Sequence, residues 1–331
     1  MDLAPREEQA MAQETVQRFL ADRYDAGSMA RAPMSLDDWR ALGELGLFAF
    51  LLPERLGGMG GGAADVMFVA EAFGRSLAIT PLAEGVLLAG ELIARGGTDA
   101  QVARWAGRLA QGEAILGFAR GGTIEAGRVS GHPGLIRDGM AAAAFIVALD
   151  RGGVALVAAE APGVLRRPVR LVDGSIAAEI SLDGTPAELL DLLPGDFDAA
   201  IALAELAIVA ELVGAMDSLL DQTVDYVKQR QQFGKAIGSF QVIQHRCARL
   251  YVMLEQARSM LLKAALDECV AVTAAKAYVC DAALRLAEDA VQLHGGMGVT
   301  DELAVGRGLR RVLLLSSLFG GGRAAREALA A

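Results

Sequence analysis

Apolar residues recur at helical spacing among charged ones along the first third of the chain. Residues 6–24 show this pattern, which predicts an amphipathic helix. Ser35 precedes a second such stretch and is a plausible N-cap. That stretch breaks at Pro53 and at the glycines after it, and the pattern resumes at Ala63 or the residue after it. We therefore expect an N-terminal helical domain over residues 1–113.

The pattern changes in the middle of the chain to short apolar runs bounded by Gly, Asp and Pro. The runs are FIVALD, GVALVAAE and AAEISLDG, at residues 145–150, 153–160 and 177–184. Such runs are typical of β-strands. Residues 114–190 are rich in glycine and contain four prolines, which predicts short strands. We expect a reduced β domain over residues 114–194.

The helical pattern returns in residues 195–331. Residues 201–213 are apolar except for Glu205 and Glu211, which predicts a helix buried on most of its faces. Further on, apolar residues recur from Ile243 at positions i, i+4, i+7 and i+11, and two more helical stretches follow. Four helices with short connections predict an antiparallel bundle. The fold class is therefore mostly α with a small β domain.

Charge and composition restrict the partners. The net charge of -10 repels phosphates on average, so nucleic acid is not expected as a partner, although a local pocket for a small anion remains open. Cys247, Cys269 and Cys280 lack metal-ligand spacing and are expected to be core residues. The acidic, polar N-terminal sequence is unlike a signal peptide, and no apolar run reaches the roughly 18 residues of a membrane span. These features predict a cytoplasmic protein.

Two short segments carry residues that helix ends and turns do not require. RQQFGKAIGSFQ starts at Arg230, and QLHGGMG starts at Gln292. A guanidinium group can bind a phosphate bidentately, an aromatic ring offers an apolar face, and glycines let a ligand approach the backbone. Taken singly, Arg230 could be a helix-end cation and Gly295 a helix C′ cap. Taken together, the two segments indicate a site for a dinucleotide phosphate.

These segments resemble the acyl-CoA dehydrogenase family, whose C-terminal bundle carries Arg-x-x-Phe-Gly, then a Gln, then Gln-x-x-Gly-Gly at matching separation. The stretch LGELGLFAFLLPERLGGMGGG followed by EAFGRSL also resembles the family. The resemblance implies a helical domain, a small β domain and a four-helix bundle, with FAD bound at subunit interfaces. It also implies which residues contact FAD, mostly that of a neighbouring subunit: Arg230, Phe233, Gln241, Gln292, Gly295 and Gly296.

The family's catalytic base is missing from its usual place. By resemblance, a glutamate in an aromatic-Glu-Gly-Thr turn removes the α-proton of an acyl-CoA thioester while hydride leaves the β-carbon for the flavin. Here Phe319 stands at that position and Gly321 replaces the threonine. Some members place the base on the first bundle helix, at the position of Ala204. Glu205 lies next to it but about 100° around the helix, and Glu211 is further along. Glu205 is thus a weak catalytic candidate, and pairing with a cation is its alternative.

The flavin-ring motifs of the β domain, Thr-Glu-Pro-x-x-Gly-Ser-Asp and Trp-x-Thr-Asn, are also absent. The resemblance therefore favours the short, base-less subunit of an α2β2 steroid side-chain acyl-CoA dehydrogenase. In that hypothesis, this chain contributes FAD contacts and a full-length homologue supplies the base. The acyl-CoA substrate, with a steroid side-chain CoA as the candidate, and an electron-transfer acceptor complete the partners. A homomeric enzyme with a relocated base and a non-catalytic scaffold or regulatory homologue are the alternatives.

Overall fold

The structure is a computed structural model that describes residues 4–24, 33–266, 269–300 and 302–330. The chain divides into two compact units, which are treated separately below. The first unit takes the described residues of 1–31, 63–79 and 205–331, and the second takes those of 32–62 and 80–204. The units are interleaved in sequence, and the division into three sequence domains stays a prediction.

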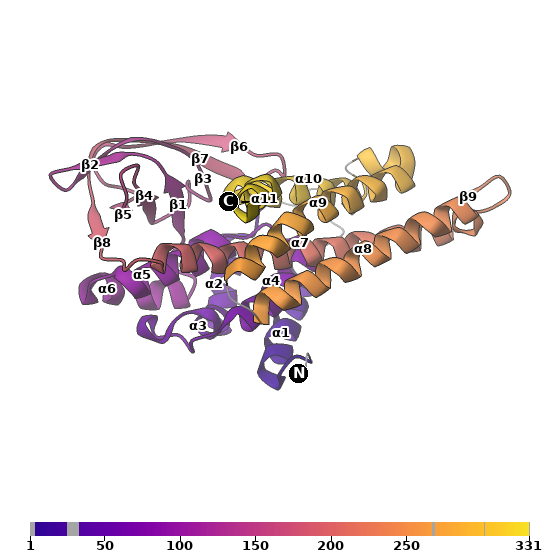
Figure 1. The fold of residues 1–331 in the computed structure, drawn as a ribbon, viewed down its shortest axis with the longest axis horizontal. Helices are drawn as coiled ribbons and strands as arrows, with labels where there is room; N and C mark the ends of the chain where they lie inside the picture. Colours follow the sequence, from indigo (N-terminus) through magenta and orange to yellow (C-terminus); the bar gives the residue numbers. More distant parts are fainter. Residues whose placement is uncertain (1–3, 25–32, 267–268, 301, 331) are drawn as a thin grey trace. The chain divides into compact units, whose positions relative to one another are not determined.

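The first unit is helical (Figure 1). Its helices are α1 (Glu7–Arg23), α4 (Ala63–Arg75), α8 (Gln241–Leu266), α9 (Cys269–His294), η4 (Gly295–Val299), α10 (Ala304–Leu315), η5 (Leu318–Gly320) and α11 (Gly321–Ala330). The helix α7 (Asp196–Gln229) begins in the second unit and continues through the first. The connection from α7 to α8 consists of β9 (Gln231–Gln232), β10 (Lys235–Ala236) and η3 (Ile237–Ser239).

Helices α7, α8 and α9 run up, down and up. Arg258 on α8 forms an ion pair of 2.6 Å with Asp217 on α7, and the backbone of Gly238 lies against Val227, so α8 returns along α7. The short connection to α9 makes α9 antiparallel to α8, and the two helices are in contact. As a result, α7 and α9 are parallel and end at the same end of the bundle. The predicted bundle helices are present, and α10 and α11 pack against α9.

Helix α7 supplies much of the apolar interior. It is long and apolar enough to cross a membrane by length and composition, but 72% of its most apolar stretch is buried inside the protein. The sequence criterion of an uninterrupted apolar run did not find it because Glu205 and Glu211 interrupt the run. Burial against other helices is the physical reason for its hydrophobicity, as expected for the core helix of a bundle.

Helices α4 and α7 cross at two glycines. A Cβ atom at Gly74 would lie 2.0 Å from the carbonyl oxygen of Glu211, and one at Gly214 would lie 2.1 Å from that of Glu71. Both obstacles are backbone atoms of the opposite helix, so they cannot rotate away. The missing side chains let the two backbones touch, which fixes the crossing point. Around it, Arg75 on α4 pairs with Asp217 and with Asp221 on α7.

The second unit combines helices with two four-stranded sheets. Its helices are α2 (Leu36–Glu44), α3 (Leu47–Leu51), η1 (Glu54–Leu56), the π-helix η2 (Leu82–Leu88), α5 (Ala89–Gly96) and α6 (Asp99–Ala110). Its strands are β1 (Leu116–Arg120), β2 (Thr123–Glu125), β3 (Arg128–Arg137), β4 (Ala144–Ala148), β5 (Val154–Ala158), β6 (Val164–Arg170), β7 (Ile176–Pro186) and β8 (Glu188–Leu190).

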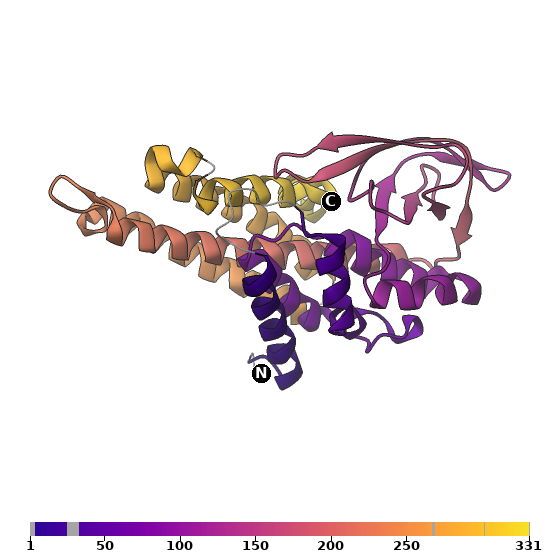
Figure 2. The same cartoon turned by 180° about the vertical axis from the view of Figure 1, so that it is seen from behind.

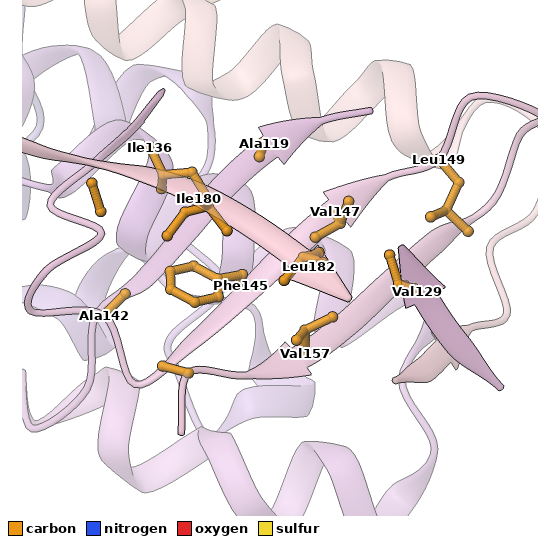
Figure 3. Close-up of a cluster of buried hydrophobic side chains, with 13 residues drawn as sticks. Ala119, Val129, Ile136, Ala142, Phe145, Val147, Leu149, Val157, Ile180 and Leu182 are labelled. Atoms are coloured by element: carbon orange, nitrogen blue, oxygen red, sulfur yellow. The ribbon is translucent and has the colours of Figure 1, made fainter. Parts of the chain in front are cut away.

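The two sheets have the strand orders β1-β4-β5-β8 and β2-β3-β7-β6. All neighbours are antiparallel except β1 and β4, which are parallel. A buried apolar cluster takes side chains from both sheets (Figure 3). Phe145 of β4 and Val157 of β5 lie close to Ile180 and Leu182 of β7 within it. The alternating burial along β7 places Ile180 and Leu182 on its inner face.

Two strands are longer than the composition predicted. β3 has 10 residues and β7 has 11, so the expectation of short strands was wrong for these two. β3 tolerates Pro133 because its pairing with β7 is irregular there, with register shifts between Val129 and Gly131 and between Gly131 and Gly134. A bulge accommodates proline and glycine that a regular ladder would exclude.

Local signals in the N-terminal region were accurate. Ser35 caps α2, since its Oγ accepts the backbone N–H of Asp38 at 3.0 Å. The break after Pro53 is real, because Gly57 and Gly60 have φ of 73° in the left-handed region that favours glycine. Helix α4 starts at Ala63 as predicted.

Candidate functional site

Arg230 follows the last residue of α7, where the chain turns back in a tight hairpin. Gln231 pairs with Ala236 and Gln232 with Lys235. The two residues of the turn, Phe233 and Gly234, have φ of 56° and 77°. Positive φ at both central positions is characteristic of a type I′ hairpin turn. The hairpin extends beyond the ends of α7 and α8 in both views (Figures 1 and 2).

Phe233 is unfavourable in this position for the chain taken alone. Its side chain is 91% exposed, and left-handed backbone costs a residue with a Cβ roughly 1–2 kcal/mol. Its ring lies at right angles to that of Phe240, with the ring centroids 6.1 Å apart. Exposure and backbone strain together are typical of a residue that completes its contacts outside its own chain.

The segment Gln292–Gly296 lies at the end of α9 and in the following turn. His294 is buried, and its ring stacks on Tyr226 of α7 with centroids 4.2 Å apart. The Tyr226 hydroxyl donates to the His294 carbonyl oxygen at 3.3 Å. Burial lowers the pKa of His294, and Nδ1 lies 2.8 Å from the Ala290 carbonyl, so the ring is neutral and donates from Nδ1. The contact ties the end of α9 to the last turns of α7.

The two sequence motifs therefore meet at one end of the bundle. Tyr226 precedes Arg230 by one helical turn, and His294 follows Gln292 by two residues. Gln241 is the first residue of α8 and belongs to the same end, since α8 is antiparallel to both neighbours. An ion pair between Arg246 of α8 and Asp289 of α9 connects the two helices near this end. The N-terminus of α8 adds a partial positive charge there.

This end has groups suited to a dinucleotide phosphate. Arg230 is exposed, and its guanidinium group has no partner among the residues that the structure describes. Gln292, Gly295 and Gly296 are exposed as well. Gly295 needs glycine because its φ is 63°. At Gly296, an added Cβ would meet nothing within 4 Å, and φ is unremarkable, so nothing in the chain itself requires glycine there.

The predicted base position has a different chemistry. Phe319 lies in the η5 turn with φ 49° and ψ 38°. Its backbone carbonyl accepts a hydrogen bond of 2.9 Å from the Nζ of Lys276, which is almost fully buried on α9. The same Nζ donates to Glu205 Oε1 at 2.6 Å. Glu205, the weak catalytic candidate, is thus engaged in an ion pair, and Ala204 beside it is fully buried.

Glu211 is held elsewhere in the core. Its Oε2 accepts a hydrogen bond of 2.8 Å from Arg311 on α10, and both side chains are buried. A buried carboxylate needs such a partner, because an uncompensated charge in the interior is costly. The pairing accounts for a glutamate on the most apolar helix without a catalytic role.

Cysteine and metal chemistry add little here. Cys280 is buried, which raises the pKa of its thiol to about 11, and Cys247 is half-buried with a raised pKa for the same reason. The side chain of Cys269 lies outside the described residues. Within the described part of the chain, no group of three or more His, Cys, Asp or Glu side chains could hold a metal ion.

Sequence reasoning missed three residues of this region. Tyr226 and His294 join the two motifs, and Lys276 donates hydrogen bonds to Glu205 and to the Phe319 carbonyl. The histidine stands inside a quoted motif, but its burial could not be read from the motif. Lys276 gave no signal, because it is separated from Glu205 by 71 positions in the sequence.

Comparison with known proteins identifies the fold. Residues 6–113 match the family model of the acyl-CoA dehydrogenase N-terminal domain, and residues 198–331 match that of the C-terminal domain. Acyl-CoA dehydrogenase IpdE2 of Mycobacterium tuberculosis is 33% identical over 318 residues, which cover 91% of this chain and 89% of that protein.

Two solved structures extend the comparison. The ChsE4-ChsE5 complex from Mycobacterium tuberculosis matches with a TM-score of 0.89 and 25% identity, covering 100% of this chain and 98% of that chain. The Tcur3481-Tcur3483 steroid acyl-CoA dehydrogenase, in a variant form, matches with a TM-score of 0.88 and 26% identity, covering 98% and 97%. The predicted fold class, helical with a small β domain, is confirmed. The chain belongs to the acyl-CoA dehydrogenase family, and FAD is its cofactor.

Proposed function

We propose that the chain is one subunit of a heteromeric FAD-dependent acyl-CoA dehydrogenase and that a homologous partner supplies the catalytic base. The observation that carries the proposal is the state of the base position. Phe319 has no side-chain acceptor, and the nearby carboxylate of Glu205 is bound to Lys276. Abstraction of a weakly acidic α-proton needs a positioned, available carboxylate. Such a carboxylate must then come from another chain.

The exposed end of the bundle is what this chain contributes. Arg230 would bind a phosphate of the cofactor bidentately, and the ring of Phe233 would pack against it. Gln292 would hydrogen-bond to a polar edge of the cofactor. The open backbone at Gly295 and Gly296 would let the cofactor approach closely. The bound FAD would supply the acceptor for the hydride that leaves the β-carbon of the acyl group. Because these groups are exposed in this chain, a neighbouring subunit could share the FAD that they contact.

The similar structures support a partner and a substrate class. Both solved relatives are named as assemblies of two different proteins, and one is named as a steroid acyl-CoA dehydrogenase. We therefore include an α2β2 assembly with a full-length homologue, a CoA thioester of a bulky steroid side chain, and a separate electron-transfer acceptor. A cytoplasmic location fits these soluble substrates.

The first test is flavin content, measured together with mass. We expect the chain purified alone to hold little flavin and the chain co-expressed with its full-length homologue to hold bound FAD. The reason is that each site needs the Arg230 end of one chain and the flavin-ring groups of another. Flavin absorbance per mole of protein and light scattering measure both quantities.

Two other results would each remove the proposal. Stoichiometric flavin in a homomer of this chain alone would make it a self-sufficient enzyme. A mixed assembly without flavin would favour a non-catalytic scaffold. In a third control, the homologue alone should neither bind flavin nor turn over at the rate of the complex.

Glu205 is the candidate base to test for a self-sufficient enzyme, because it lies next to the position where some relatives place the base. In the assembled complex, Glu205→Gln is expected to keep turnover within about twofold of the native value, since the carboxylate is already engaged with Lys276. Steady-state rates per mole of flavin-loaded complex measure this. A loss of two or more orders of magnitude, at unchanged flavin content, would instead assign the base to Glu205.

A further inference from the structure

The vacated base position contains a charged cluster that the proposed function does not use. Lys276 lies in the middle of α9 with a side chain only 1% exposed. Its Nζ reaches Glu205 Oε1 at 2.6 Å and the carbonyl oxygen of Phe319 at 2.9 Å. It also lies 5.7 Å from the centroid of the Phe319 ring. One ammonium group therefore connects α9, α7 and the turn that replaces the base.

A lysine this deeply buried is costly unless its charge is compensated. Desolvation of an ammonium group amounts to several kcal/mol, and only close partners of opposite charge recover it. Glu205, at 15% side-chain exposure, is the partner that carries the charge. Neither residue is therefore free to leave the other without a large loss of stability.

The turn around Phe319 also depends on this lysine. Phe319 has left-handed backbone, and Gly320 and Gly321 after it also have positive φ, of 79° and 63°. Such a conformation is unfavourable for a residue that has a side chain, so interactions with the surroundings must stabilise it. The hydrogen bond from Lys276 to the Phe319 carbonyl is one such interaction.

We propose that Lys276 is a positioning residue that keeps the base position of this subunit closed. Its ammonium group ties the Glu205 carboxylate to the backbone of Phe319, so no free carboxylate is available at either place. The inference rests on the proposed function for its biological meaning, although its test does not involve flavin or the partner.

The same cation would also disable a restored glutamate. A carboxylate introduced by Phe319→Glu would lie within the few ångströms over which an opposite charge lowers the pKa of an acid. A base with a depressed pKa is poorly matched to removal of a weakly acidic proton. Replacing Phe319 by glutamate would therefore not be enough to restore a base, because the ion pair between Lys276 and Glu205 would have to change as well.

Two further titratable groups on α9, Cys280 and Asp281, lie near the cluster. Burial raises the pKa of Cys280, one turn along α9, to about 11, so its thiol stays neutral at ordinary pH. Asp281 pairs with Arg326, and both side chains are about half exposed.

The test is a double-mutant cycle on the full-length chain, read by thermal denaturation. We expect Lys276→Met and Glu205→Gln each to lower Tm by about 6–10 °C, because each leaves one buried polar partner uncompensated. The double variant Lys276→Met/Glu205→Gln should lose clearly less than the sum of the two, as coupled residues do. This smaller loss in the double variant would distinguish a specific interaction between the two residues from two independent packing effects.

A control pair lies on the same helix. Arg326→Met/Asp281→Asn removes an ion pair between α11 and α9 whose side chains are about half exposed. It should change Tm by no more than about 2 °C and show no coupling of this size. Additive losses in the Lys276 and Glu205 cycle would overturn the proposal. That result would not affect the flavin-sharing function.

Discussion

Arg230→Ala in the co-expressed complex is expected to release most of the FAD and to leave the assembly intact. Charge-assisted hydrogen bonds contribute about 1.5–3 kcal/mol, which corresponds to roughly a 10- to 150-fold weaker affinity. The loss should fall on flavin binding and not on folding, because the guanidinium group has no partner among the described residues of its own chain. Fluorescence titration of the complex with FAD after mild stripping measures the dissociation constant.

Two further variants make this experiment specific. Lys228→Ala removes another exposed cation two residues earlier, which pairs loosely with Asp225 at 3.9 Å, and should leave FAD affinity within about twofold. Arg230→Lys keeps the charge and loses the planar fork, so it should fall between the native protein and Arg230→Ala. An Arg230→Ala complex with native flavin affinity would contradict the proposed site and favour the scaffold alternative.

Gly214→Ala is expected to be among the most destabilising single substitutions in the chain. The new Cβ would lie 2.1 Å from the Glu71 carbonyl oxygen and 2.6 Å from the Arg75 backbone nitrogen, so α4 and α7 would have to separate. Overpacking typically costs 1–3 kcal/mol, and we expect about 3 kcal/mol because both obstacles are backbone. Thermal denaturation should show a Tm lower by roughly 6 °C.

A glycine elsewhere separates this steric cost from the general effect of alanine. Gly107 lies in α6, and an added Cβ there would meet nothing within 4 Å, so Gly107→Ala should raise stability by about 0.5–1 kcal/mol. The double variant Gly74→Ala/Gly214→Ala should lose less than the sum of its parts, since one separation of the helices relieves both contacts. A neutral Gly214→Ala would show that the crossing is not as close as the structure describes.

Local sequence signals predicted local structure well. Ser35 was recognised as an N-cap and Ala63 as a helix start, because a cap or a restart depends on residues a few positions away. Strand β4 was recognised from its apolar run. Strand β3 was missed, since Gly131, Pro133 and Gly134 look like a loop unless the irregular pairing with β7 is known.

The candidate site shows the same difference between local features, which the sequence predicts, and long-range contacts, which it does not. The residues of the two motifs were named from the sequence, and their role in FAD binding stays a prediction. Their convergence depends on the parallel course of α7 and α9 and on the stacking of Tyr226 on His294, which no local pattern contains. The fate of Glu205 was equally hidden, because a glutamate on an apolar helix looks the same whether it is a base or the partner of Lys276.

The two ends of α7 serve separate purposes, and that separation has an evolutionary consequence. Glu205 and Tyr226 are 21 residues apart on one continuous helix, a distance of roughly 30 Å. We therefore expect mutations near Glu205 to leave the end that carries Arg230 unchanged. After a gene duplication, one copy could lose its own chemistry and still be preserved by selection for the half-site it lends to its sister. Divergence of the two copies would then make each obligatory for the other.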